Sequence, residues 1–208
     1  MLKYAKAPDK PKTFDVDIKT AADAVKAIAQ TRPPQSKEFD DVWGKYKADF
    51  ITAQFDKCGY CELPLAAHPG DVEHFSPKAE IQSEPVSEKD WGQEGKGDYS
   101  VVGRKLPAFS DYGYWWRAYE WTNYLVACNR CNTGWKRNLF PVGNVPRPKP
   151  PAMGTTELEL LLNPFRGEDP ADHLEYDNLG QVKARNKSPY GTATIRTCGL
   201  DRDSLVRA

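Results

Sequence analysis

Two pairs of cysteines constrain this chain more than any other feature of its sequence. Cys58 and Cys61 have the same C-x₂-C spacing as Cys128 and Cys131, and 66 residues separate the two pairs. Four thiolates in two such pairs suit the tetrahedral coordination of Zn²⁺ in a closed structural site. That site would clamp the ends of a long segment, which otherwise carries a loop-closure cost. The spacing therefore predicts a structural zinc centre, with buried core thiols or a redox pair as the alternatives.

The expected cellular setting supports metal binding by these cysteines. Residues 1–6 lack the apolar core of a secretory signal, and no apolar run reaches the length of a membrane span. We therefore expect a cytoplasmic protein, in which thiols stay reduced and a C-x₂-C pair is a metal ligand rather than a disulfide. Cys198 belongs to neither pair and is expected to be a packed thiol.

Charge is balanced overall but distributed unevenly. The chain has 29 Lys and Arg residues and 29 Asp and Glu residues, so no overall basic field argues for a nucleic-acid partner. Residues 121–156 nevertheless contain no acid and five cations, which are Arg130, Lys136, Arg137, Arg147 and Lys149. This stretch is either a solvated basic loop or a surface that meets a phosphate backbone.

Periodicity and turn signals divide the chain into four segments. Residues 1–56 are expected to form an N-terminal arm and helices, 57–141 a core around the cysteines, 142–151 a proline-rich linker, and 152–208 a C-terminal module of a hairpin and a helix. Within the core, a polar and weakly periodic stretch predicts an insertion at about 79–113. The fold class that follows is α+β.

Local patterns predict the individual elements. An extended arm over 1–15 precedes an Ala-rich helix over 20–30. Ser36 can cap a second helix, and its apolar stripe should be buried; the stripe is Phe39, Val42, Trp43, Tyr46, Phe50 and Phe55. A strand is expected over 71–75, a helix of about two turns behind Cys131, and a hairpin that turns at 177–180.

An ordered set of polar residues lies between and behind the cysteine pairs. It consists of Glu73 and His74 on the expected strand, Asn123 before the second pair, and Asn132 and Lys136 after it. This order, in the segments CGYC, VEHFSPK, YEWTNYLVAC and CNRCNTGWK, resembles the HNH endonucleases, whose core is a ββα-metal finger. Together with the downstream LLNPF and DHLEYDNLGQV, it is similar to the HNH nuclease component of Septu-type and retron-associated anti-phage defence systems. The resemblance covers about residues 55–185.

The resemblance implies an enzyme that hydrolyses phosphodiester bonds. His74 would be the general base, because a neutral imidazole can accept a proton from water near pH 7. Glu73 and Asn132 match the positions that hold a catalytic Mg²⁺ or Mn²⁺ through oxygen atoms. Asn123 matches the residue that braces the loop carrying the base. These implied roles make His74, Asn123 and Asn132 the catalytic candidates.

Two points qualify these assignments. In a regular strand Glu73 and His74 point to opposite faces, so both serve one phosphate only if the strand ends or bends there. Asp71 is the substitute ligand if it does not. Lys136 lies four residues after Asn132, on the same helical face. With Arg130 and Arg137, it is expected to contact nucleic-acid phosphates.

The resemblance also implies a partner. A free, non-specific nuclease would endanger its host, so we expect an ATPase subunit that holds this chain in a defence complex. DNA is favoured over RNA as the substrate, although no 2′-hydroxyl-reading element separates them. The alternative is a non-catalytic, zinc-stabilised nucleic-acid-binding or scaffold module. That module needs the four cysteines but neither His74 nor Asn132.

Overall fold

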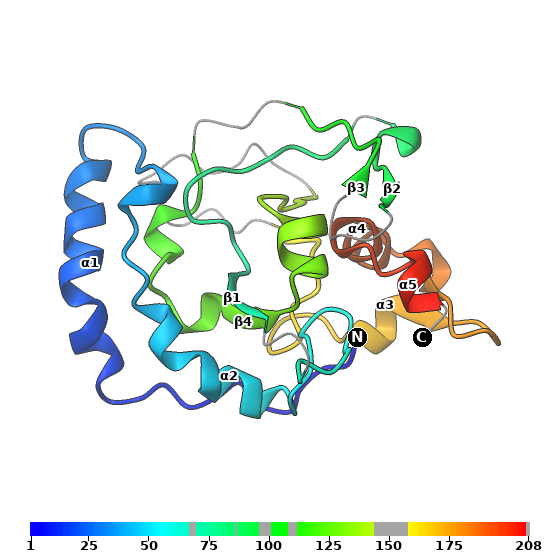
Figure 1. Cartoon of the computed structure of the whole chain (residues 1–208), viewed down its shortest axis with the longest axis horizontal. Helices are drawn as coiled ribbons and strands as arrows, with labels where there is room; N and C mark the ends of the chain where they lie inside the picture. The colour runs from blue at the N-terminus through cyan, green and yellow to red at the C-terminus, as the bar shows by residue number, and fades with distance from the viewer. Residues whose placement is uncertain (67–69, 86, 96–100, 108–111, 144–157, 207–208) are drawn as a thin grey trace.

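Two short antiparallel strands lie at the centre of the structure (Figure 1). β1 (Asp71–His74) pairs with β4 (Tyr124–Ala127), so that Asp71 lies opposite Ala127 and His74 opposite Tyr124. All four residues of β4 are buried. The structure is a computed structural model that describes residues 1–66, 70–85, 87–95, 101–107, 112–143 and 158–206. The strand expected over 71–75 is confirmed.

The N-terminal helix is longer than its sequence signal. α1 (Phe14–Ala29) begins where the extended arm was expected to end, and Phe14, Ala21 and Val25 bury one of its faces. Acidic residues in the first turn favour this earlier start, because carboxylates interact well with the positive end of the helix dipole.

The single helix expected from Ser36 is wrong. Three short elements replace it: η1 (Ser36–Glu38), η2 (Trp43–Tyr46) and α2 (Lys47–Ala53). Glu38 accepts a hydrogen bond from the backbone of Gln35 and caps the start of the first turn, which ends where the backbone becomes extended at Phe39. Asp41 accepts from the backbone of Gly44 where the next turn starts. The aromatic stripe is still buried up to Phe50. Phe55 is the exception, with 71% of its surface exposed.

The expected insertion leaves and re-enters the core at one point. Gly113 donates to the carbonyl of Ala79 at 2.9 Å, and Tyr114 donates to the carbonyl of Pro77 at 2.7 Å. Between these ends lie η3 (Glu88–Asp90) and a two-stranded sheet of β2 (Gln93–Glu94) and β3 (Val101–Val102). Two short turns, η4 (Trp115–Arg117) and η5 (Trp121–Asn123), then lead into β4.

The helix behind the second cysteine pair is a π-helix. η6 (Arg130–Lys136) has backbone hydrogen bonds that span five residues, from Gly134 to Asn129 and from Arg137 to Asn132. π-helical turns are rare and are found frequently at functional sites. Arg137 ends the helix with a φ of 49°.

The C-terminal segment packs against the core. It contains α3 (Pro170–His173), the hairpin of β5 (Leu174–Tyr176) and β6 (Val182–Ala184), η7 (Arg185–Lys187), α4 (Pro189–Cys198) and α5 (Asp203–Val206). The hairpin is confirmed, and the Asp177 carboxylate accepts from two backbone N–H groups of its turn. α4 was not expected and packs against η6.

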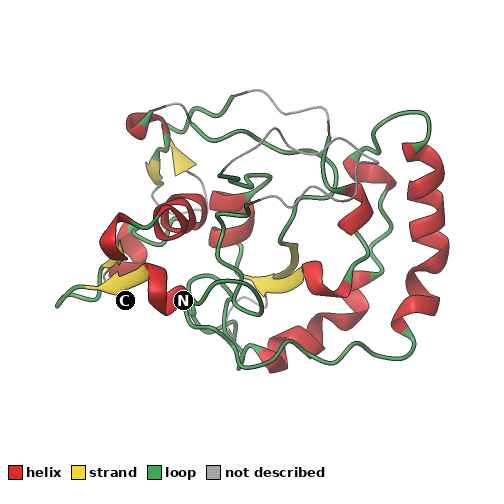
Figure 2. Ribbon diagram, turned by 180° about the vertical axis from the view of Figure 1, so that it is seen from behind, coloured by secondary structure: helices red, strands yellow, loops and turns green. Residues whose placement is uncertain are grey.

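Short helices and two-stranded antiparallel sheets surround the central strand pair (Figure 2). This arrangement is the expected α+β class. Within the described ranges, no helix has both the length and the apolar character needed to cross a membrane. Most of the expected linker, including Arg147 and Lys149, lies outside the described residues. In its described part, Val142 forms a bridge with Glu159, and Gly143 donates to the carbonyl of Leu158 at 2.9 Å.

Candidate functional site

The four paired cysteines converge in space. Their Sγ atoms all lie within 4.8 Å of one another, and those of Cys61 and Cys128 are 3.7 Å apart. A tetrahedral zinc site with bonds of about 2.3 Å has sulfur atoms about 3.8 Å apart. The cluster could therefore hold a structural metal such as zinc. Cys198 is fully buried outside the cluster, as expected for a packed thiol.

A buried glutamine joins the first cysteine pair to β4. Gln54, at the end of α2, donates to the carbonyl of Val126 at 2.8 Å and accepts from its N–H at 2.7 Å. Gly59, between the two cysteines, also donates to Val126 at 2.9 Å. These bonds hold the turn that carries Cys58 and Cys61 beside the strand that leads to Cys128. Sequence reasoning missed this role of Gln54.

A buried arginine contacts the cluster from the C-terminal segment. Arg202 is 3% exposed and donates to Cys131 Sγ at 3.4 Å and to the carbonyl of Gly199 at 2.8 Å. Four thiolates around a divalent ion carry a net negative charge, which a nearby cation offsets. No local sequence signal could have identified Arg202, because its contact crosses most of the C-terminal half of the chain.

A pocket of about 320 Å³ brings together residues that lie far apart in the sequence. Its walls include Glu73 and His74 from β1, Asn132 from η6 and Arg137 just beyond it. Lys78, which the sequence analysis gave no role, also lines this pocket. The pocket therefore contains the candidate base, both candidate metal ligands and two cations.

The surroundings of His74 determine which ring nitrogen can act as a base. Its Nε2 lies 3.0 Å from the carbonyl oxygen of Ala118. A carbonyl can only accept, so Nε2 carries the proton and Nδ1 keeps its lone pair. The ring of Trp43 packs at 4.4 Å and holds the imidazole in place. Burial, assisted by the charge of Lys78, lowers the pKa of His74 well below its usual value, so the ring is neutral near pH 7.

Asn123 ties down the loop that follows His74. It is 2% exposed, and its side chain accepts from the N–H of Ser76 at 2.8 Å. It also donates to the carbonyls of Ser76 at 3.1 Å and Arg117 at 3.0 Å. These are the contacts that a bracing residue would make.

The phosphate contact predicted for Lys136 is wrong, because this residue is buried instead of lying at the surface. Its side chain is fully buried, its ammonium pairs with the carboxylate of Glu73, and it donates to the carbonyl of His74 at 3.1 Å. The physical reason is that η6 turns this position toward β1 instead of toward solvent. Burial raises the pKa of Glu73 although Lys136 opposes this shift. The pair locks η6 onto the strand that carries His74.

The other charged candidates are placed differently. Arg137 is exposed and lines the pocket. Arg130 pairs with Glu94 of β2 at 2.7 Å and does not line it. Asp71, the substitute ligand, is exposed and is likewise not part of the described pocket wall. β1 ends at His74, which is the condition under which Glu73 and His74 could serve one phosphate.

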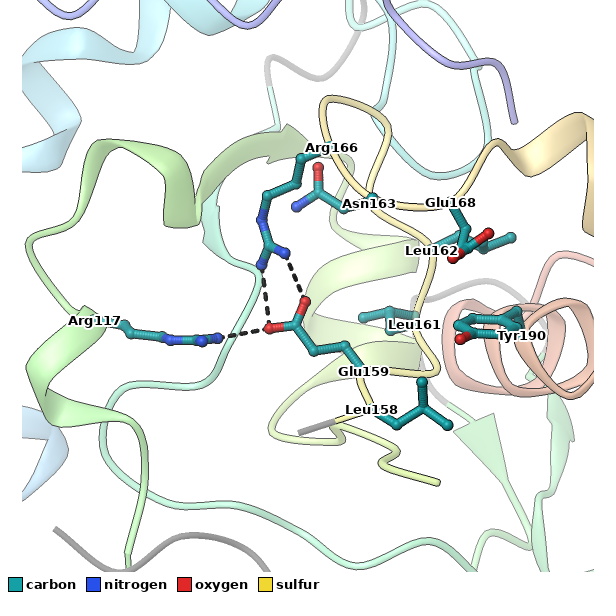
Figure 3. Close-up of a pocket in the computed structure, with 10 residues that line it drawn as sticks. Arg117, Leu158, Glu159, Leu161, Leu162, Asn163, Arg166, Glu168 and Tyr190 are labelled. Atoms are coloured by element: carbon teal, nitrogen blue, oxygen red, sulfur yellow. Dashed lines mark hydrogen bonds and ion pairs between the residues drawn. The ribbon is translucent and has the colours of Figure 1, made fainter. Parts of the chain in front are cut away.

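A second pocket, of about 360 Å³, contains two arginines that converge on one carboxylate (Figure 3). Arg117 and Arg166 reach Glu159 from different elements, at 2.7 and 2.6 Å. Arg117 also donates to Ser76 Oγ at 2.9 Å and thereby joins this network to the loop behind His74.

Comparison with known proteins identified a relative. No family model matches the chain, and no solved structure matches it. The chain is 34% identical over 152 residues to the Septu protein PtuB of Bacillus mycoides (strain KBAB4). The matched region is 72% of this chain but 44% of the relative, so the chain spans less than half of the protein that it matches. This similarity supports a Septu-type defence protein.

Proposed function

We propose that this protein is an HNH endonuclease that hydrolyses phosphodiester bonds of nucleic acid within an anti-phage defence complex. The observation that carries the proposal is the common pocket of His74 and Asn132, which come from β1 and η6. The order of strand β1, strand β4 and helix η6 agrees with a ββα core. The cysteine cluster would hold a structural zinc that fixes the start of η6, and with it Asn132.

His74 would act through Nδ1. Because Ala118 occupies Nε2, the free lone pair can take a proton from the attacking water. Burial keeps the imidazole neutral, which is the form a general base requires. Asn123 would act indirectly, by fixing the backbone that follows the base.

The remaining polar groups suit a hard cation. Asn132 and Glu73 offer an amide oxygen and a carboxylate, a donor type that fits Mg²⁺ or Mn²⁺. Such an ion, when bound, supplies charge stabilisation at the leaving oxygen. Because Glu73 already pairs with Lys136, Asn132 is the more accessible ligand. Arg137 at the pocket is the better phosphate contact, whereas Arg130 is engaged by Glu94.

The defence role and its partner are inferred from the relative's name and from the sequence resemblance. We infer an ATPase subunit as the partner and DNA as the favoured substrate. The exposed face of α1 is the more tractable docking surface to test, because removing residues 152–208 would also remove Arg202 from the cysteine cluster.

The test compares His74→Ala with a control, His173→Ala. His173 lies outside the pocket and contacts Ser188. Both variants are purified with any co-purifying partner and assayed on plasmid DNA and on RNA with Mg²⁺ or Mn²⁺. His74→Ala should lose about 10²–10⁴-fold in cleavage rate, whereas His173→Ala should match wild type. Equal cleavage by wild type and His74→Ala would remove His74 as the base. No cleavage by wild type in any condition would favour the non-catalytic module.

A further inference from the structure

Lys78 differs from the other inward-pointing cations of the structure. Its Nζ lies 4.6 Å from the ring centroid of Trp43 and 5.9 Å from that of Phe39. In the part of the chain that the structure describes, no hydrogen bond or ion pair reaches this ammonium. By contrast, Lys136 is paired with Glu73, and Arg202 is hydrogen-bonded to Gly199.

This arrangement leaves donors unused. An ammonium group has three N–H donors and no acceptor. Contact with an aromatic face offsets part of its lost hydration but supplies no oxygen. Burial lowers the pKa of Lys78, although the charges of Glu73 and Asp41 oppose the shift. The group therefore lies in the pocket partly desolvated and still able to donate.

The charges of the pocket favour an anion beside Lys78. The charged residues of its wall are Glu73, Lys78, Glu80 and Arg137. Glu73 has its own buried counter-ion, Lys136. On the wall itself two cations therefore remain against Glu80, before any catalytic ion binds, and Asp41, which does not line the pocket, is a further acid whose charge reaches Lys78.

We propose that Lys78 contacts a non-bridging oxygen of the scissile phosphodiester. The assignment rests on the proposed nuclease function and names a substrate contact that the sequence analysis did not include. Lys78 follows His74 by four residues and lines the same pocket, so both groups can face one phosphate. During hydrolysis the water oxygen bonds to phosphorus, His74 takes the water proton, and the leaving oxygen departs and is protonated by solvent. Negative charge on the phosphoryl oxygens increases along this path, and a fixed ammonium stabilises it.

The experiment uses Lys78→Met, which keeps an unbranched stem over Trp43 but removes the charge. Lys78→Arg keeps the charge, and Lys105→Met is the matched control, because the Lys105 side chain is 80% exposed and lies outside both the His74 pocket and α1. Each protein is purified with its partner. Single-turnover cleavage of a labelled duplex is measured with Mg²⁺ or Mn²⁺. Binding of the same duplex is followed by fluorescence anisotropy across a salt series with neither ion and no chelator, so that zinc is retained.

Lys78→Met should cleave about 10²–10³-fold more slowly, and its log–log salt slope for binding should be smaller by about one. Lys78→Arg should recover most of both losses, and Lys105→Met should match wild type. The melting temperature of Lys78→Met should stay near that of wild type.

Three results would overturn the assignment. One is a Lys78→Met protein with wild-type cleavage and slope. The second is an equal loss of cleavage in Lys78→Met and Lys78→Arg, accompanied by lower melting temperatures in both, which indicates a packing role. The third applies if wild type does not cleave, an outcome that by itself contradicts the nuclease proposal. In that case a Lys78→Met protein whose salt slope for binding equals that of wild type would show that Lys78 contacts no phosphate.

Discussion

The pocket of His74 and the pocket of Figure 3 are similar in size and differ in how their cations are used. In Figure 3, Arg117 and Arg166 both donate to Glu159, so an acid of the same pocket already pairs with their charges. In the other pocket, Lys78 lies over aromatic rings with no oxygen partner among the described residues. Positive charge alone therefore does not make an anion site; the cation must also lack an acid partner of its own.

The pKa values of the buried acids in the two pockets, Glu73 and Glu159, shift in opposite directions. Glu73 is deeply buried, and burial raises its pKa although its ion pair with Lys136 and the charge of Lys78 oppose the shift. For Glu159, burial also acts to raise the pKa, but the hydrogen bonds and charges of Arg166 and Arg117 outweigh it and hold the value below its usual range. The first carboxylate is poorly stabilised as an anion, and the second is well stabilised.

The cysteine cluster could hold a structural metal, and preventing metal binding there should destroy both pockets, which is the largest effect expected. A structural zinc is worth about 10–16 kcal/mol of apparent binding free energy in small zinc domains, where binding is coupled to folding. Elemental analysis should find zinc in wild type, and Cys131→Ser should lose both this zinc and the cooperative thermal transition. Cys198→Ala, outside the cluster, should keep the metal. A zinc-free wild type that melts as cooperatively as the loaded protein would contradict this expectation.

Breaking the buried ion pair should have the next largest effect, confined to the His74 pocket. Lys136→Met leaves Glu73 charged and buried, and should lower the free energy of unfolding by about 3–5 kcal/mol in urea titrations. The double variant Glu73→Gln/Lys136→Met should be clearly more stable than Lys136→Met alone, because no charge is stranded.

Lys19→Met is the control for this experiment. Its pair with Asp23 is exposed on α1, so no measurable loss is expected. The single variant Glu73→Gln completes the cycle. If the stability lost in the double variant equals the sum of the losses in Glu73→Gln and Lys136→Met, the contact between Glu73 and Lys136 contributes nothing of its own.

Glu159→Gln should have the smallest effect, and this effect should depend on pH. Because the folded-state pKa of Glu159 is lowered, its contribution is present above the unfolded-state value of about 4.3 and is lost as pH falls through the folded-state value. The variant should be less stable than wild type by about 1 kcal/mol near pH 7, and the two curves should converge in acid.

Urea titrations from neutral to acidic pH would measure this difference. Glu168→Gln, in the same pocket but more exposed, is the control and should follow the wild-type curve. The opposite trend, a difference that grows toward acid, would mean that the arginines do not stabilise the ionised form. Freed from Glu159, Arg117 and Arg166 should also bind inorganic phosphate more tightly than in wild type, which would make this pocket resemble the other.

Features with local signals were predictable from the sequence. The cysteine spacing indicated a cluster that the structure forms, and turn residues indicated the hairpin that begins at Leu174. α4 could have been predicted from Ser188 and Pro189 at its start and Gly199 after its end, a standard set of helix boundaries.

Features set by tertiary packing were not predictable in this way. Periodicity could not show that Lys136 turns inward to meet Glu73, because a wide helical turn and a facing strand decide its direction. Nor could it show that the backbone becomes extended at Phe39 and so divides the helix expected from Ser36. Lys78 lies in the segment VEHFSPK, but the sequence does not show that its ammonium packs over the ring of Trp43 and lacks an oxygen partner among the described residues.

The closure of the insertion at Ala79 and Gly113 has a consequence for how this protein can vary. A side chain at Gly113 would come within 2.5 Å of the Ala79 backbone, so glycine is required where the two ends meet. Because backbone hydrogen bonds join the two ends, the length of the segment between them can change while β1 and β4 keep their register. Natural variation in length should therefore concentrate there, at positions other than Glu94 and Arg104, whose side chains contact Arg130 and the backbone of Trp135.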